Sequence, residues 1–506
     1  MQIIIFALII IAEFLTTPKV LLFYDQIEYL KIVSTHSFLQ VFTLGHFPIH
    51  PIFLSTFWMT SRIVVPNYTA FIFGVISAIL MFKICAKIFS KEKYFWIPAL
   101  LFLLFPGVWL INTNLMIQSV LLTFYLFAIY FFIKRKAFAF LLTLFLMMGV
   151  HVDALYWIPT IFLIPILLKK ELKIDKKITI RFAKLAFLSV ALSVLFYAFI
   201  YVFIRKDFGG STEQIFAYSS FGFLRIIRNI WVAFINSFGS VTPFILLFLL
   251  IKNVRSKIEW VAWFVFALLM SVGGAYWEGD LMMRRIVFAG VILSIALYKY
   301  LKEKSVFLIL FLLPIVGLNA LLYYKNSPDM PLIVMQKSID KLPKGQVLLA
   351  SHYYYPFIKY DGKILWFESG DINQIDGLLN DGKRIFITRE SIAAPYLLVV
   401  GNNYHITSLS KVGNSESRVL FDKYMFDLYG DSLEIKRMGD GKISESAGEP
   451  VVFYGKTFLQ RLSRMRINYG DGGVWIWSIV SGHKDAVYWT YKDARGAWVW
   501  PEISIQ

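Results

Sequence analysis

Residues 2–22 read QIIIFALIIIAEFLTTPKVLL, and residues 23–30 read FYDQIEYL. An apolar run of about 17–25 residues is long enough to cross the hydrocarbon core of a membrane. The run has neither a basic start nor a small-residue cleavage site, so it predicts a retained anchor helix rather than a removed signal peptide. Such a helix would bring the acidic stretch that follows it to the membrane surface.

The rest of the chain is also too apolar for a soluble globule. Hydrophobic residues make up 58% of its 506 residues, and the mean hydropathy is +0.63, whereas soluble domains have about 45–50% apolar residues. After Tyr324 the composition shifts toward Gly, Asp, Ser and Lys. We therefore expect an α-helical polytopic membrane domain over residues 1–324 and a soluble α/β domain over residues 325–506.

The apolar runs predict about eleven spans. They lie near 2–22, 68–88, 95–111, 117–133, 137–151, 155–168, 182–204, 232–251, 259–276, 285–300 and 305–324. The segments 137–151 and 155–168 are open to a second interpretation, as half-helices or one re-entrant hairpin. In the C-terminal domain, short apolar runs predict strands at Val347–Ala350, Ile364–Phe367 and Arg384–Thr388, with a helix at Asp371–Leu379. Later β-rich segments are expected at 451–454 and 474–479.

The net charge of +18 is distributed unevenly between the loops. Lysine and arginine concentrate in alternate loops, at 87–93, 134–136, 169–177, 252–257 and 299–304. The positive-inside rule places these loops in the cytoplasm, so the charge reports topology and predicts no nucleic-acid partner. The loops with candidate polar residues, and the C-terminal domain, would then lie outside the cytoplasmic (inner) membrane. The single cysteine, Cys85, excludes an intramolecular disulfide.

Asp25 follows the first predicted span, and residues 46–51 then read HFPIHP. The two prolines argue against a continuous helix there, so His50-Pro51 predicts a turn that starts a helix at the membrane surface. As a general base, Asp25 would accept the proton of an attacking hydroxyl or amine. The structural alternative is that Asp25 caps a helix beginning at Gln26.

The pattern of Asp25 followed by His50-Pro51 resembles the GT-C superfamily of membrane glycosyltransferases, in particular the branch of protein-O-mannosyltransferases and lipid A aminoarabinose transferases. The resemblance implies a polyprenyl-phosphate-linked sugar as donor and a lipid, glycan or protein as acceptor in the cell envelope. It also implies that Asp25 is catalytic. Many family members carry a second acidic residue near the fourth helix, where this chain has Asn112, Asn114 and Gln118. The cofactor is therefore left open between none and a divalent cation, Mg²⁺ or Mn²⁺.

Other polar residues are candidates for substrate binding, each with a structural alternative such as solvation or anchoring at the interface. Arginines on the outer side oppose the positive-inside tendency and offer bidentate contacts to the carrier phosphate. Histidine and acidic side chains would position the donor or the acceptor. The candidates are Glu28, His46, His50, His151, Asp153, Arg225, Arg228, Arg284 and Arg285.

Two rival functions share these features. A polymerase or ligase of polyprenyl-linked surface glycans would use the same face and the same lipid chemistry. A lipid or glycolipid transporter would move its substrate without cleaving a bond. Coupled transporters usually need ionisable residues near the membrane midplane. Few such residues lie within the predicted spans, Glu13 being the clearest, and this scarcity argues against the transporter.

Overall fold

The computed structural model places the described residues in two compact units, one of helices within residues 2–313 and one from residue 336 onward. The described residues are 2–17, 67–151, 153–164, 168–199, 237–238, 286–310, 312–313, 336, 339–350, 358–366, 375–388, 406–408, 411–412, 424–429, 432–437, 486–488, 491–492, 498–499 and 502–504. The predicted spans 232–251, apart from residues 237 and 238, and 259–276 lie outside these ranges.

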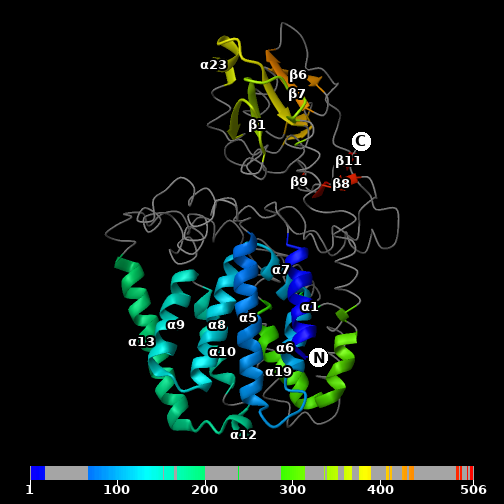
Figure 1. Ribbon diagram of the computed structural model, residues 1–506. Helices are drawn as coiled ribbons and strands as arrows, with labels where there is room; N and C mark the ends of the chain where they lie inside the picture. Colours follow the sequence, from blue (N-terminus) through cyan, green and yellow to red (C-terminus); the bar gives the residue numbers. More distant parts are fainter. Residues whose placement is uncertain are drawn as a thin grey trace. The chain divides into compact units, whose positions relative to one another are not determined.

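The helical unit is a bundle of mostly apolar helices (Figure 1). Its elements are α1 (Gln2–Leu15), α5 (Asn67–Ile88), α6 (Ile97–Leu104), α7 (Pro106–Thr113), α8 (Ile117–Ile133), α9 (Ala137–Val150), α10 (Ala154–Ile161), α12 (Lys169–Leu172), α13 (Lys176–Phe199), α19 (Ala289–Leu301) and the 3-10 helix η4 (Lys302–Ser305). Along the bundle, α8 packs between α5 and α9, α13 packs on α9, and α19 packs on α6.

Two of these helices, α5 and α13, are each long and apolar enough to cross a membrane. The pair α7 and α8 passes the same test together, although it is bent by 112° at the break. Shorter apolar stretches occupy Ile4–Leu15, Ala137–Val150 and Ala289–Lys299. The described part of the chain thus has the helices of a membrane protein, and the number of eleven spans stays a prediction.

The predicted span at 95–111 differs from the structure, which divides it into α6 and α7. Phe105 separates the two helices with an extended backbone, φ −64° and ψ 127°. The cause is Pro106, because the proline ring disfavours the α conformation of the residue before it. Pro106 in turn occupies the first turn of α7, where a missing N–H costs no hydrogen bond.

Aromatic side chains fill the interior between α8, α9 and α13. The rings of Phe132, Phe140, Phe162 and Phe182 contact one another with centroid separations from 5.0 to 6.3 Å. Because lipid is as apolar as these rings, close packing rather than the hydrophobic effect holds such helices together.

Helix α13 contacts the bundle through one narrow stripe. Phe182, Ala186, Ser189, Ser193 and Tyr197 are its buried residues, and the Ser189 hydroxyl donates to the Leu141 carbonyl at 2.9 Å. The other faces of the helix are exposed, and the exposed fractions of Phe187 and Leu195 reach 78% and 68%.

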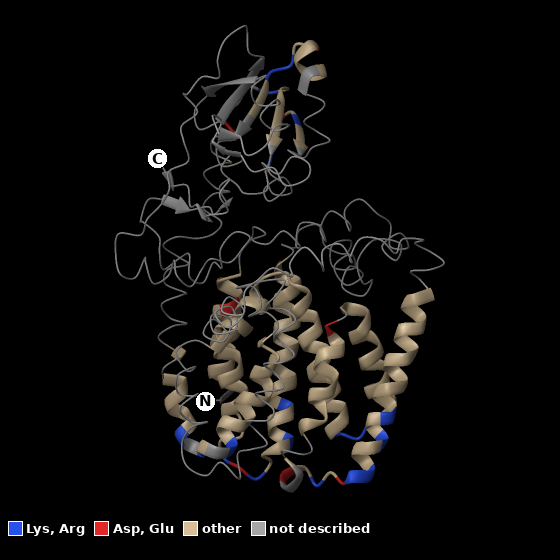
Figure 2. Ribbon diagram, turned by 180° about the vertical axis from the view of Figure 1, so that it is seen from behind, with Lys and Arg blue, Asp and Glu red and all other residues tan. Residues whose placement is uncertain are grey.

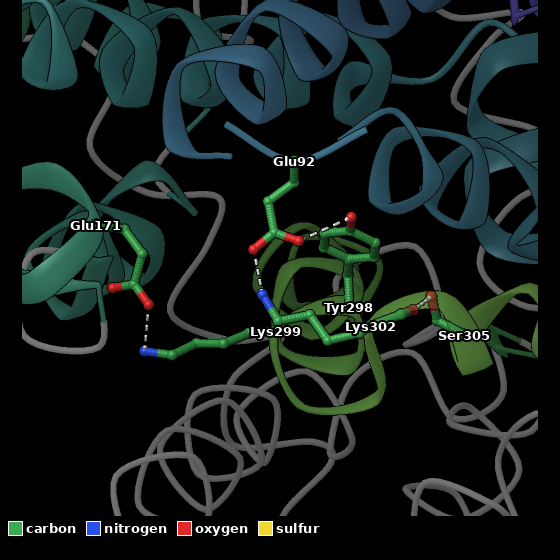
Figure 3. Close-up of polar contacts among 6 residues, drawn as sticks. All are labelled: Glu92, Glu171, Tyr298, Lys299, Lys302 and Ser305. Carbon is green, nitrogen blue, oxygen red and sulfur yellow. Dashed lines mark hydrogen bonds and ion pairs between the residues drawn. The ribbon is translucent and has the colours of Figure 1, made fainter. Parts of the chain in front are cut away.

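The described lysines and arginines of the helical unit gather at or near one end of the bundle, which we call the basic end (Figure 2). Ion pairs join its segments there (Figure 3). Glu92, which follows α5, pairs with Lys302 and accepts a hydrogen bond from Tyr298 at 3.3 Å. Lys299 pairs with Glu171 of α12 at 3.1 Å. The end of α19 is thereby tied to the loop after α5 and to α12.

The second unit contains a five-stranded mixed sheet in the order β2-β1-β3-β7-β6. Its strands are β1 (Val347–Ala350), β2 (Lys363–Trp366), β3 (Ile385–Thr388), β6 (Tyr424–Tyr429) and β7 (Ser432–Arg437), and α23 (Ile375–Asn380) connects β2 to β3. Strand β1 runs parallel to β2 and β3, whereas β7 is antiparallel to β3 and β6. The first three strands and the helix confirm those predicted from the sequence, with bounds shifted by one residue or a few.

The described residues also form three two-stranded pairs. They are β4 (Ile406–Ser408) with β5 (Lys411–Val412), β8 (Ala486–Tyr488) with β11 (Glu502–Ser504), and β9 (Tyr491–Lys492) with β10 (Trp498–Val499). The segments 451–454 and 474–479 lie outside the described residues.

Candidate functional site

Most of the site residues predicted from the sequence lie outside the described residues. These are Asp25, Glu28, His46, His50, Arg225, Arg228, Arg284 and Arg285. His151 and Asp153 are described, and both lie at the end of the bundle opposite the basic end. That placement follows from connectivity, because α9 begins after the basic residues 134–136 and ends at Val150.

His151 and Asp153 form a local pair between α9 and α10. His151 ends α9 with an extended backbone, and Asp153 precedes the first turn of α10. The backbone N–H of Asp153 donates to His151 Nδ1 at 3.1 Å, and Asp153 Oδ1 lies 3.3 Å from the same nitrogen. The imidazole is partly exposed at 26%, whereas the carboxylate is buried at 3%. A neutral ring accepts the backbone N–H through Nδ1, and a protonated ring donates to the carboxylate instead.

A second carboxylate at this end of the bundle comes from α1. Glu13 lies two residues before the end of α1 at Leu15 and is fully buried. Asn112 Nδ2 on α7 donates to Glu13 Oε1 at 3.2 Å. The residues are 99 positions apart in the chain, so the contact joins two helices that are distant in sequence.

Helix α5 holds the amide of Asn112 from the other side. A Cβ atom at Gly74 would lie 2.7 Å from Asn112 Cγ and 3.0 Å from its Oδ1. Real Cβ atoms do not approach other atoms so closely, so only glycine fits here with the amide in this position. Asn112 is therefore held between Glu13 on α1 and the backbone of α5.

The turn between α7 and α8 is fixed by further buried amides. The Leu115 backbone N–H donates to Asn67 Oδ1 at 2.8 Å, which ties the turn to the start of α5. Asn114 Nδ2 donates to the Leu110 carbonyl at 3.0 Å and to the Thr113 hydroxyl at 3.2 Å. Irregular backbone within a membrane bundle needs such partners, because no water is available to satisfy its polar groups.

Together these groups define what we call the polar end of the helical unit. Its buried carboxylates and asparagines are Glu13, Asn67, Asn112, Asn114 and Asp153, supplied by α1, α5, α7, the residue after α7, and the junction of α9 and α10. They comprise two carboxylates and three amides, and the partly exposed His151 lies beside Asp153. Such groups bind hydroxyl-rich or cationic ligands through hydrogen bonds.

Glu13 is not among the site residues that the sequence predicts. The sequence indicates it only as an ionisable residue within a span, and Asn112 stands where many GT-C proteins carry a second acidic residue. In the structure these two residues form one contact, because Glu13 of α1 supplies the carboxylate beside Asn112. An isolated acid in an apolar run was the available signal.

Within the described ranges, no group of three or more His, Cys, Asp or Glu side chains is arranged to hold a metal ion. Asp25 and His50 lie outside those ranges. Metal dependence therefore stays open.

No protein-family model and no curated protein matches the chain. Among solved structures, the crystal structure of ArnT from Cupriavidus metallidurans in the apo state is similar with a TM-score of 0.33 and 10% sequence identity. The similarity covers 86% of this chain and 97% of that chain. A TM-score of 0.33 assigns neither a fold nor a family.

Proposed function

We propose that the chain is a GT-C-like membrane glycosyltransferase that works on the outer face of the cytoplasmic membrane. It would transfer a sugar from a polyprenyl-phosphate carrier to a glycan, lipid or protein. The observation that carries the proposal is the separation of the two ends of the helical unit. Basic residues gather at one end, whereas the helix bounds and contacts place Glu13, Asn112 and the pair His151–Asp153 at the other. Helix α1, which buries Glu13 at the polar end, is also the helix that leads toward Asp25.

The proposed reaction is a single displacement at the anomeric carbon of the donor sugar. The acceptor oxygen or nitrogen forms a bond to that carbon while the bond to the carrier phosphate breaks. Asp25 takes the proton of the nucleophile, and the leaving polyprenyl phosphate keeps the electron pair. Arg284 and Arg285 would stabilise the phosphate charge that develops. His50, Glu28 and the pair His151–Asp153 would position the substrates.

The test is the release of free polyprenyl phosphate by the purified full-length chain. The chain would receive polyprenyl phosphates that carry different sugars, together with a crude preparation of surface glycan. We expect release by the wild type and loss of at least about a hundredfold in Asp25→Asn, because a positioned general base contributes about 10²–10⁴-fold. Glu171→Gln is the matched control, since Glu171 is a carboxylate at the basic end.

The outcomes distinguish the rival functions. Equal release by the wild type and by Asp25→Asn would show that Asp25 is not the general base, and it would favour the polymerase or ligase. No release from any donor would contradict the proposal.

A coupled transporter is the second candidate, and the burial of Glu13 is the observation that favours it. Ionisable residues inside membrane helices commonly mark ion pathways. Against this, Glu13 lies in the last turn of α1 rather than near its middle. Movement of intact sugar-lipid across proteoliposomes, abolished by Glu13→Gln and without carrier release, would establish the transporter.

A further inference from the structure

Several buried oxygen atoms at the polar end have no hydrogen-bond partner among the interactions of the described residues, and two of them belong to side chains that contact each other. One is Glu13 Oε2 and the other is Asn112 Oδ1. Their side chains are 0% and 1% exposed, so bulk solvent does not reach them. A buried polar atom without a partner costs free energy, and a carboxylate costs more than a neutral group.

The orientation of both groups is fixed by the contacts that they do make. Asn112 uses Nδ2 to donate to Glu13 Oε1 at 3.2 Å. While Glu13 Oε1 carries no proton, turning the amide over would bring two acceptor oxygens together, so Oδ1 stays on the side of Gly74. The geometry therefore presents Asn112 Oδ1 as an acceptor.

Stability alone does not account for this pair. Replacing a buried polar pair by apolar residues of similar volume is often neutral or stabilising. Buried polar groups that lack a hydrogen-bond partner are commonly found at functional sites. Glu13 and Asn112 join α1 to α7, and each keeps an oxygen without a partner. They lie beside Gly74, a position that only glycine fits. This arrangement is consistent with a ligand site.

The free atoms determine the chemistry of the ligand. Asn112 Oδ1 needs a donor, which an ionised phosphate lacks. A hydroxyl group both donates and accepts, so it can pair with Asn112 Oδ1 and with either protonation state of Glu13. We propose that Glu13 and Asn112 bind hydroxyl groups of the donor sugar, while the carrier phosphate binds elsewhere. This inference rests on the proposed function, because a lipid-linked donor is what brings a sugar to the end of membrane helices.

The experiment compares dissociation constants for carriers with and without a sugar, using the full-length chain in nanodiscs. The probes are bare undecaprenyl phosphate and undecaprenyl phosphate carrying glucose, mannose or xylose. We expect the wild type to bind at least one sugar-bearing carrier about tenfold more tightly than the bare carrier, as for a pair of buried hydrogen bonds. The double variant Glu13→Met/Asn112→Leu should bind the bare carrier unchanged and lose the preference.

The control is the double variant Ser77→Ala/Thr123→Val, which removes the buried 2.8 Å hydrogen bond between α5 and α8. It should retain the preference. Glu13→Gln, of equal volume, replaces Oε2 or Oε1 by an NH₂ group and should reduce the preference several-fold, which gives a second measurement if the double variant does not fold.

The inference is overturned if Glu13→Met/Asn112→Leu and Glu13→Gln keep the full preference for the sugar-bearing carrier over the bare carrier. It is also overturned if the wild type shows no such preference. If the wild type also releases carrier in that case, the proposed function stands. If it neither binds nor releases any carrier, both fail.

Discussion

Asn112 connects three helices through one small amide. It belongs to α7, donates to Glu13 of α1, and lies against Gly74 of α5. Its closest neighbour at Gly74 has no side chain, so the fit depends on the absence of a single methyl group. Substitution at that glycine is the most direct way to disturb the pair without removing either polar group.

Gly74→Ala should therefore lower the thermal stability of the chain. The new Cβ would lie 2.7 Å from Asn112 Cγ, so the amide or α5 has to move. Overpacking of this kind costs about 1–3 kcal/mol. Thermal unfolding in nanodiscs measures the change, and Gly377→Ala in α23 is the control, because nothing lies within 4 Å of its Cβ position. The control should leave stability unchanged or raise it by up to about 1 kcal/mol through helix propensity. An equal midpoint for Gly74→Ala and the wild type would show that the amide yields without cost.

Among the elements, the bend of 112° between α7 and α8 shapes the polar end. The bend puts backbone groups of the connecting turn inside the bundle, where they need partners. Asn67 supplies one of these partners from the first position of α5, through the N–H of Leu115. One amide thus fixes the turn at which Asn112 and Asn114 are placed.

Asn67→Ala should destabilise the bent pair by about 1–3 kcal/mol, because it leaves the buried Leu115 N–H without its acceptor. Asn67→Asp keeps an acceptor oxygen but buries a carboxylate, so we expect it to stabilise the turn less well than Asn67 does. Hydrogen exchange at residues 112–118 would locate the effect. Uniform exchange across α5 and α8 in the alanine variant would contradict a role specific to the turn.

The ion pairs at the basic end should contribute little to stability. Glu92 is 32% exposed and Lys302 is 51% exposed, so water screens their attraction. Exposed ion pairs are typically worth about 0–1 kcal/mol. Glu92→Gln should therefore leave the unfolding midpoint within a few degrees of the wild type. A fall as large as that expected for Gly74→Ala would mean that the basic end, and not the polar end, sets the stability of the bundle.

The sequence predicted those elements whose limits have local chemical signals. Helix α8 has the predicted bounds, since polar residues precede it and Lys134–Lys136 follow it. Strand β1 was also predicted with its observed bounds. The division at Phe105 was missed, because the apolar pattern of 95–111 continues across Pro106. The pair His151–Asp153 was predictable because its members are adjacent on the chain, whereas the Glu13–Asn112 contact spans 99 positions and leaves no local pattern.

Over the whole helical unit, the arrangement of charge predicts which end faces the cytoplasm. The basic end includes the loop after α5, and the polar end includes the junction of α9 and α10. The single native cysteine, Cys85, is buried, so it should give little background in labelling experiments.

Lys91→Cys and His151→Cys should therefore differ in their reaction with a membrane-impermeant maleimide. We expect His151→Cys to react in intact cells whose outer barrier has been opened, and Lys91→Cys only after the inner membrane is permeabilised. His151 is partly exposed and Lys91 is exposed, so both sites are accessible once the reagent reaches them. The reverse pattern would invert the topology and place the polar end in the cytoplasm.

The narrow stripe that attaches α13 also bears on how the protein can be handled. Most of this helix is exposed, so in a membrane annular lipid would cover it, and its buried stripe consists of three small residues and two aromatic rings. Small residues permit close approach but bring few contacts of their own. Extraction with harsh detergent should therefore detach α13 before the inner helices separate, so native lipid is part of what keeps the bundle complete.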